Sequence, residues 1–219
     1  MNSEWSQLNK AMQLQLKKKD SFNNGIETLI TLRRSLMKQV TEFKNTLTDN
    51  DFSAMPFINV NGYHNKTVAY SLYHVFRVED IVANTLISKT PQVFFSGDYQ
   101  ARMNSSIITT GNELVKQEIA DFSEKLDIDE LYNYISDVDK STTCLLKTLS
   151  FSDMKTVMTE QDKDTVCSLK VVSEDEKAAW LIDYWCSKNI QGLLQMPFSR
   201  HWIMHIEASL RIVNKITLK

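Results

Sequence analysis

The chain has 219 residues, of which 42% are hydrophobic and 24% are charged, as in an ordinary globular protein that can bury a substantial core. Its 25 Lys and Arg residues nearly balance its 27 Asp and Glu residues, so no net field favours nucleic acid or an anionic membrane as a partner. Five glycines and three prolines are too few for many tight turns, and this scarcity favours long helices over short strands.

The remaining global features concern the cellular compartment. The polar N-terminal run MNSEWSQLNK does not resemble a secretory signal, and no apolar run reaches transmembrane length. Cys144, Cys167 and Cys186 lie far apart without a CxxC spacing, which is typical of reduced thiols. We therefore expect a cytoplasmic protein without a membrane partner.

Residues 3–47 predict helix, with a break near the run NNG at residues 23–25. The break would separate an N-terminal helical extension, residues 1–24, from the rest of a single domain spanning residues 1–219. After the break, apolar residues recur at helical spacing, and they are Ile26, Leu29, Ile30, Leu32, Leu36, Val40, Phe43 and Leu47.

A second helix is predicted over residues 65–88, with its first residue, an asparagine, as the N-cap and with Pro91 beyond its end. A long connection over residues 91–127 follows, and its last part, residues 113–125, predicts a short helix. A third long helix is predicted over residues 128–149, where leucine, isoleucine and valine recur at helical spacing.

The C-terminal third is predicted to contain two further helices. The polar segment 159–166 indicates a surface excursion, and a helix over residues 174–186 follows with Ser173 as its N-cap. Pro197 stands where a first helical turn tolerates proline, so the last helix is predicted over residues 198–216. The expected fold is all-α, with four principal helices, a long crossover between the second and third, and extra short helices.

Two of the four histidines, His201 and His205, are four residues apart on the last predicted helix and therefore share one face. Two neutral imidazoles in this arrangement bind one divalent ion when a third ligand faces them. The pattern is loose, because a helix with one core histidine and one exposed histidine gives the same spacing. It also differs from the zinc-protease motif, since Trp202 stands where that motif places its glutamate.

His74 lies near the middle of the second predicted helix, beside an apolar stripe where an unpartnered imidazole would be costly. Facing helices pack about 8–10 Å apart, close to the span that two opposed metal-bound imidazoles bridge. We therefore predict that His74, His201 and His205 form an open metal site, whose ligand set suits Zn, Ni, Fe or Cu. His64, just before the second helix, is predicted to be a surface loop residue.

The run YSLYHVFRVEDIVANTLI, preceded by NGYHNKT, resembles the second helix of the DinB/YfiT-like superfamily. There a histidine, often followed by an arginine and an acidic pair, supplies one metal ligand, and His74, Arg77, Glu79 and Asp80 match this pattern. The histidine pair of the last predicted helix matches the family's H-x-x-x-H pair. Helix order and the long crossover also agree, so the resemblance covers about residues 25–216.

The resemblance implies a four-helix bundle of up-down-down-up type, often dimeric, with nickel or zinc on three histidines in a cleft. The sequence departs from the family pattern in two respects. The run MPFSRHWIMH lacks the small, acidic and second-histidine neighbours of the commoner last helix. The N-terminal segment and the insertion near residues 159–166 also lie outside the expected core, so the subfamily stays open.

The acids nearest the three histidines in sequence are Glu79, Asp80 and Glu207. Ligand histidines commonly donate their second N–H to a carboxylate or a backbone carbonyl, and these acids are candidates for that role. Arg77, one turn from His74, either holds an anionic substrate group or joins Glu79 and Asp80 in an ion-pair network between helices. The network is the more common arrangement.

We expect a metal-dependent enzyme that acts on a small molecule, with transfer of a low-molecular-weight thiol somewhat ahead of hydrolysis. The transferase expectation is implied by the resemblance. No GxSxG motif, Cys–His neighbour pair or phosphate-binding glycine loop occurs, so the metal would carry the chemistry, and no catalytic residue is assigned. The protein is expected to be a homodimer. The alternative is a non-catalytic, stress-linked binding or dimerisation module with a vestigial metal site.

Overall fold

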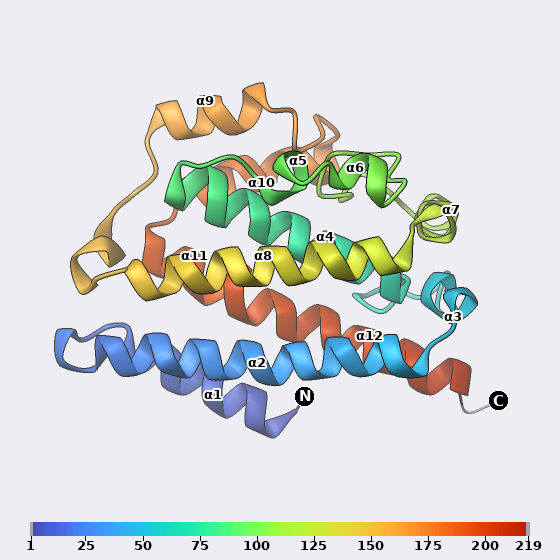
Figure 1. Ribbon diagram of the computed structural model, residues 1–219, viewed down its shortest axis with the longest axis horizontal. Coiled ribbons are helices and arrows are strands. Elements are labelled where there is room, and N and C mark those ends of the chain that lie inside the picture. Colours follow the sequence, from blue (N-terminus) through green and yellow to red (C-terminus); the bar gives the residue numbers. More distant parts are fainter. Residues whose placement is uncertain (1, 218–219) are drawn as a thin grey trace.

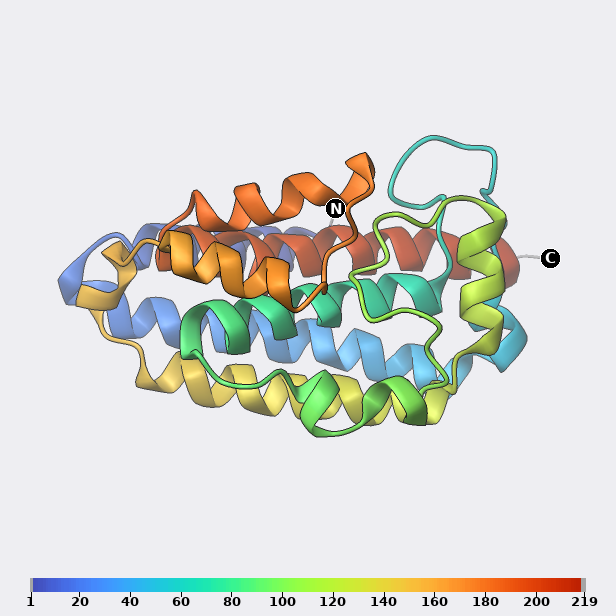
Figure 2. The same cartoon turned by 90° about the horizontal axis from the view of Figure 1, so that it is seen from above.

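The computed structural model describes residues 2–217, which fold into helices without a β-strand among them. The prediction of an all-α fold is confirmed. An isolated bridge pairs Val157 with Asn189. Long helices run side by side along the long axis of the molecule (Figure 1 and Figure 2), and they are α2 (Phe22–Thr46), α4 (Val68–Asp80), α8 (Ile128–Thr148) and α12 (His201–Thr217).

The N-terminal helix α1 (Ser3–Gln15) packs along α2 and is joined to it by a turn that includes a 3-10 segment, Lys19–Ser21. The break therefore precedes residues 23–25, which belong to α2, and its predicted position was wrong. A Cβ on Gly25 would lie 2.8 Å from Leu16 Cδ2 and 3.0 Å from the Leu16 nitrogen. The glycine therefore lets the two segments approach closely and does not end a helix.

Helix α4 begins later than predicted, because Thr67 and not Asn65 is its N-cap. The Thr67 hydroxyl accepts a hydrogen bond from the Tyr70 backbone nitrogen (3.0 Å), whereas the Asn65 nitrogen belongs to a preceding turn. Beyond α4 the coil widens into a π-helical segment, Ile81–Ser88. It ends at Lys89, whose left-handed backbone (φ 56°) stops the helix two residues before the proline.

The crossover between α4 and α8 contains three short helices: α5 (Val93–Ser96), α6 (Tyr99–Arg102) and α7 (Gln117–Lys125). The short helix expected over residues 113–125 therefore begins at residue 117. Asp80 fastens the start of the crossover to α4, because its carboxylate accepts hydrogen bonds from the Val93 and Phe94 nitrogens, each at 2.9 Å.

The segment predicted as a surface excursion is a helix, α9 (Glu160–Ser168). Thr159 and Asp162 cap it reciprocally: the Thr159 hydroxyl accepts from the Asp162 nitrogen (3.2 Å) and the Asp162 carboxylate accepts from the Thr159 nitrogen (2.8 Å). Val166 is buried, and α9 packs against the π-helical segment that follows α4. Its polar composition reflects its position at the surface, as predicted, but the sequence analysis did not predict that the segment is helical.

Helix α10 (Glu176–Cys186) is capped by Asp175, whose carboxylate accepts from the Lys177 nitrogen (2.8 Å), and not by Ser173 as predicted. The last helix, predicted over residues 198–216, corresponds to α12 and to the end of a π-helical segment (Met196–Arg200) that contains Pro197. A short helix that was not predicted, α11 (Ile190–Gln195), precedes this segment. The π-helical segment ends immediately before His201, which belongs to the predicted metal site.

A buried charge network joins the four long helices. Both terminal nitrogens of Arg33 donate to Glu79 at 2.7 Å, and one of them also donates to Asp139 at 2.7 Å. The indole nitrogen of Trp202 donates to the same Glu79 carboxylate (2.7 Å), while the Arg33 guanidinium lies over the Trp202 ring at 4.4 Å. Glu79 is thus part of an ion-pair network, as predicted, but its partner is Arg33 and not Arg77. Arg77 pairs instead with Asp80 at 3.4 Å.

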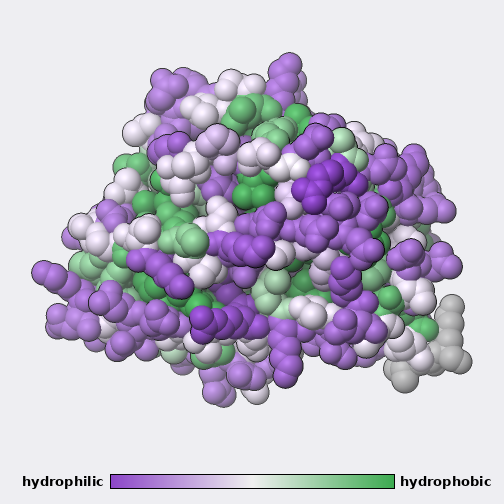
Figure 3. Space-filling view, viewed as in Figure 1, coloured by the Kyte–Doolittle hydropathy of each residue, from purple (hydrophilic) through white to green (hydrophobic). Residues whose placement is uncertain are grey.

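Apolar side chains on both sides of this network fill the interior in two clusters of buried residues. On the face shown in Figure 3, hydrophilic side chains cover much of the surface, and the apolar side chains between them form scattered areas. No helix within residues 2–217 is long and apolar enough to cross a membrane.

Candidate metal centre

Helices α4 and α12 bring the three predicted ligand residues, His74, His201 and His205, together. His74 Nε2 lies 3.0 Å from His201 Nε2, and one ring nitrogen from each residue lies within 4.8 Å of the others. All three side chains are buried. Within residues 2–217, this is the one group of three or more His, Cys, Asp or Glu side chains close enough to hold a metal ion.

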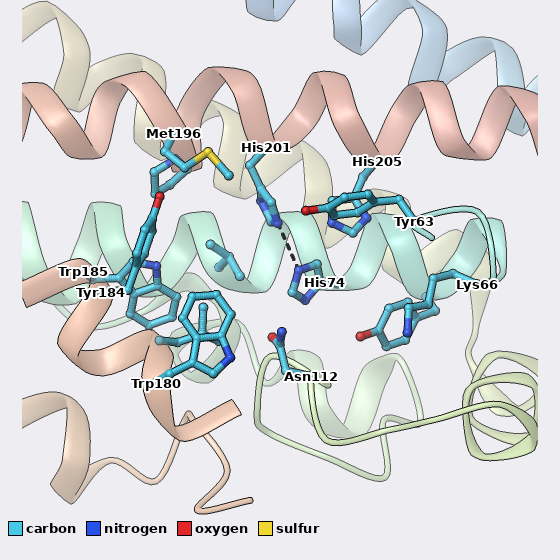
Figure 4. A pocket seen from close by; sticks show the side chains of 14 residues that line it. Tyr63, Lys66, His74, Asn112, Trp180, Tyr184, Trp185, Met196, His201 and His205 are labelled. Atoms are coloured by element: carbon cyan, nitrogen blue, oxygen red, sulfur yellow. Dashed lines mark hydrogen bonds between the residues drawn. The ribbon is translucent and has the colours of Figure 1, made fainter. Parts of the chain in front are cut away.

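Figure 4 shows His201 and His205 extending from α12 toward α4, and the contacts of Trp202 with α4 fix this rotation of α12. The indole of Trp202 donates to Glu79, and its ring packs against Phe76 with 4.6 Å between ring centroids. Both partners lie on α4, on the side that faces the interior network. His201 and His205 are one turn apart, and Trp202 lies about 100° around the helix from His201. Docking of the indole on α4 therefore turns both imidazoles toward His74.

The irregular crossover segment 107–111 lies along α4 and orients His74. Side chains spaced three or four residues apart on α4 donate hydrogen bonds to successive backbone carbonyls of this segment. They run from Tyr70 to Gly111 O (2.9 Å), from Tyr73 to Ile107 O and Thr109 O (3.1 Å each), from His74 Nδ1 to Thr110 O (2.8 Å) and from Arg77 to Ile108 O (2.6 Å). The Thr110 carbonyl therefore orients the His74 ring by accepting its hydrogen bond.

Gly111 allows this segment to follow α4 closely. Its φ of +78° lies in the left-handed region that favours glycine. A Cβ at this position would also lie 3.1 Å from the ring of Tyr70, which donates to the Gly111 carbonyl. Because of this backbone conformation and this short distance, a larger residue at position 111 would displace the segment that carries the Thr110 carbonyl.

The ring nitrogens have the chemistry that a metal ion needs. Because His74 Nδ1 donates to a carbonyl, His74 Nε2 carries a lone pair that points at His201 Nε2. Metal–nitrogen bonds of about 2.0–2.1 Å place neighbouring ligand atoms about 3 Å apart, which matches the 3.0 Å between these two nitrogens. The Nδ1 atoms of His201 and His205 are buried without a hydrogen-bond partner among the described residues. The facing Nε2 atoms of His74 and His201 are the positions at which a cation would bind.

Burial controls the protonation of the three imidazoles. It lowers the pKa of His74 to about 4; the hydrogen bond to Thr110 only partly offsets this effect, and the positive charge of Lys66 adds to it. Burial also holds the pKa values of His201 and His205 well below their usual range, and neighbouring histidines lower them further. All three rings are therefore neutral at neutral pH, which is the form that binds a metal ion.

The metal-free protein should lose stability as the pH falls from about 6.5 toward 4. In this window an unfolded histidine is protonated while His74, with its pKa of about 4, is not, so unfolding takes up a proton and becomes easier. His74 alone accounts for a loss of about 2 kcal/mol between pH 7 and pH 5. Urea titrations of chelator-treated protein at the two pH values measure it. His74→Gln should reduce the loss of stability between the two pH values. An equal loss in the variant and the wild-type protein would contradict its attribution to His74.

The three histidines line a pocket of about 380 Å³. In Figure 4 the aromatic side chains of α10, including Trp180 and Tyr184, lie on one side of His74 and Lys66 lies on the other. Asn112 faces His74 from the crossover. Burial lowers the pKa of Lys66. The pocket therefore gives a small molecule access to the histidine cluster.

The acids proposed as partners of the ligand histidines do not contact them. Glu79 is five residues after His74, about 140° around the helix, and it faces the Arg33 network. Asp80 accepts hydrogen bonds from Tyr134, Asn84 and the crossover backbone. Sequence proximity was therefore misleading, because helical rotation directs these acids away from the cluster.

Two further predicted residues also lie apart from the cluster. Glu207, two residues after His205, accepts a hydrogen bond from the Asn2 backbone nitrogen. His64 lies in the loop before α4 and packs edge-on against Phe57, with 4.9 Å between ring centroids. The prediction of His64 as a loop residue outside the metal site is confirmed.

Sequence reasoning missed the Thr110 carbonyl, Lys66 and the α10 aromatics. A backbone carbonyl leaves no mark in the identity of its residue, although Gly111 beside it is a signal of unusual local geometry. Tyr63 was also missed, and its ring packs edge-on against His205 with 5.5 Å between centroids. These residues come from loops and from α10, whose positions depend on tertiary packing.

The fold and site define an all-helical protein with three buried histidines close enough to hold a metal ion. No protein-family model matches the chain, and no curated protein matches it in sequence. The functional interpretation therefore depends on the site itself.

Proposed function

We propose that His74, His201 and His205 bind a divalent metal ion, nickel or zinc, and that the chain is a metal-dependent enzyme of the DinB/YfiT-like type. The proposal is supported by the convergence of three buried, neutral imidazoles at a pocket, which is the observation that carries it. Three protein ligands leave coordination positions open, as in catalytic sites and unlike closed structural ones.

The proposed four-helix bundle is supported by the arrangement of α2, α4, α8 and α12 side by side (Figure 1). The long connection between α4 and α8 corresponds to the crossover that the family resemblance implies. The histidines also come from the second and the last of these four helices, in the order that the resemblance implies.

A divalent ion bound here would supply Lewis-acid chemistry, lowering the pKa of a thiol or a water molecule at an open position. The residues of this chain contribute binding and orientation. No Ser, Thr, Cys, Asp or Glu is among the described residues that line the pocket. The lining therefore offers no aliphatic hydroxyl, no thiol and no carboxylate base, and its hydroxyls are the phenols of Tyr63, Tyr70 and Tyr184. The lack of a carboxylate base favours thiol transfer over hydrolysis in our proposal.

The lack of a carboxylate base in the pocket lining also supports a second candidate function, a non-catalytic binding module with a vestigial metal site. The two candidates differ in what reaches the metal. An enzyme of the proposed type admits a thiol to an open position, whereas a vestigial site leaves the coordination unchanged when a thiol is added.

Metal analysis of untagged protein purified without chelator tests the proposal. We expect about one nickel or zinc ion per chain by mass spectrometry, because all the ligands are neutral and preformed. Protein loaded with nickel should then change its absorption spectrum when a small thiol is added, since thiolate ligation to nickel absorbs strongly. Absence of stoichiometric metal, together with no uptake of added nickel or zinc, would overturn the proposed function. Metal uptake without a thiol response would favour the binding module.

A further inference from the structure

The pocket beside the histidines has two chemically different ends. In Figure 4, Trp180 and Tyr184 of α10 lie on one side of His74, and Lys66 lies on the other side, next to the loop that precedes α4. The histidine cluster lies between them. A ligand that fills the pocket therefore meets an aromatic surface at one end and a cation at the other.

The aromatic end presents the ring surface of Trp180, whose one polar group already has a partner. The indole nitrogen of Trp180 already donates to the Lys177 carbonyl (2.8 Å), one turn back on its own helix. The Trp180 side chain is nevertheless 50% exposed, and Tyr184 packs edge-on against it with 5.6 Å between centroids. Leu181 and Pro197 add apolar surface to the lining. A half-exposed indole in an apolar pocket wall suits a flat or apolar ligand group.

The opposite end presents a positive charge that no acid neutralises. Lys66 is half-buried, and its ammonium lies over the Tyr70 ring, 5.3 Å from the centroid. No carboxylate within residues 2–217 forms an ion pair with it, and no acidic residue is among the described pocket lining. Cations in such surroundings gain by pairing with an incoming anion.

Asn112 adds a neutral donor between the two ends. Its side-chain oxygen accepts a hydrogen bond from the Thr110 hydroxyl (2.8 Å), which orients the amide. The amide nitrogen is then left without a partner among the described residues, and Figure 4 shows this side chain facing His74. Lys66 and Asn112 thus both offer N–H donors near the cluster, and such donors suit an oxygen-rich anionic group.

We propose that the pocket binds an amphipathic organic acid, with its carboxylate at Lys66 and its apolar or aromatic body against Trp180 and Tyr184. In such a substrate, the bond that reacts would lie over the histidine cluster. That last placement rests on the proposed metal-dependent function, whereas the recognition of the two ends follows from Lys66 and the α10 aromatics alone.

Isothermal titration with three matched probes tests the proposal: phenylbutyrate, its neutral analogue phenylbutanol, and butyrate, which lacks the ring. The probes are titrated into the protein as purified and into chelator-treated protein. We expect phenylbutyrate to bind about tenfold more tightly than phenylbutanol to both forms, because one charge-assisted hydrogen bond contributes at least about 1.4 kcal/mol. Butyrate should bind more weakly than phenylbutyrate.

Variants assign the two ends of the ligand. Lys66→Met keeps the length of the side chain and should remove the preference for the acid over the alcohol. Trp180→Ala should weaken both phenyl compounds severalfold and leave butyrate unaffected. Lys140→Met removes an exposed lysine from α8, outside the pocket, and should match the wild-type protein.

Equal affinity for the acid and the alcohol, or a preference that survives in chelator-treated Lys66→Met, would overturn the proposal. A preference seen only with metal bound would also overturn it, since the metal and not Lys66 would then hold the carboxylate. Preference for the acid without any metal uptake would overturn the proposed function and leave this inference standing. Metal uptake without a preference for the acid would leave the proposed function standing and overturn this inference.

Discussion

His74→Ala should lower the affinity of the protein for its metal ion by more than about 100-fold, beyond the 10–100-fold typical of losing a residue that only supports a ligand. His74 is the single proposed ligand from α4, and its ring is oriented by the Thr110 carbonyl at 2.8 Å. Without it, the ion would keep two ligands from one side, His201 and His205, which are one helical turn apart. Competition titrations with a chromogenic chelator measure the affinity.

His64→Ala is the matched control, because it removes the remaining histidine from the loop that precedes α4. His64 packs against Phe57 and lies outside the cluster, so this variant should bind metal as the wild-type protein does. Circular dichroism of both variants in chelator establishes that they are folded, and His74→Gln preserves side-chain volume if alanine does not. Unchanged metal affinity in folded His74→Ala would refute the three-histidine assignment.

Glu79→Ala should destabilise the protein by about 3–5 kcal/mol, because it leaves the Arg33 guanidinium buried without its bidentate partner. The Trp202 indole nitrogen would lose its acceptor at the same time. Denaturant unfolding monitored by circular dichroism gives the free energy of unfolding. Since Trp202 sets the rotation of α12, the variant should also weaken metal binding, although Glu79 does not contact the histidines.

Asp129→Ala provides the comparison for this second variant. Asp129 pairs with Lys44 at 2.9 Å between α8 and α2, but its side chain is 84% exposed. Exposed pairs contribute at most about 1 kcal/mol, so the loss should be small. Similar losses from Glu79→Ala and Asp129→Ala would show that the buried network does not hold the helices together.

Much of the helical architecture follows from local sequence. The apolar spacing in α2 and α8 is visible along the chain, because each side of a helix repeats every three to four residues. The predicted third helix, residues 128–149, differs from α8 by one residue. The boundaries that were wrong depended on competing polar groups, such as Thr67 beside Asn65, and only the path of the chain decides which of two such groups becomes the cap.

The loop contacts at the candidate metal site could not be predicted in this way. The π-helical segment Met196–Arg200, the Thr110 carbonyl and the position of Lys66 arise where distant segments meet. A backbone carbonyl is the same in every residue, so no motif marks the one that orients His74. The roles of the acids after His74 were likewise decided by the helices packed around them.

The sequence by itself determined the helical class and the placement of the three histidines on two helix faces, since both depend on the regular 3.6-residue period of the helix. Tertiary structure alone decided that these faces meet, that the rings are buried and neutral, and which groups surround them. The reason is physical: distances between atoms that are 127 residues apart in the chain, such as those of His74 and His201, are set by the packing of the whole core.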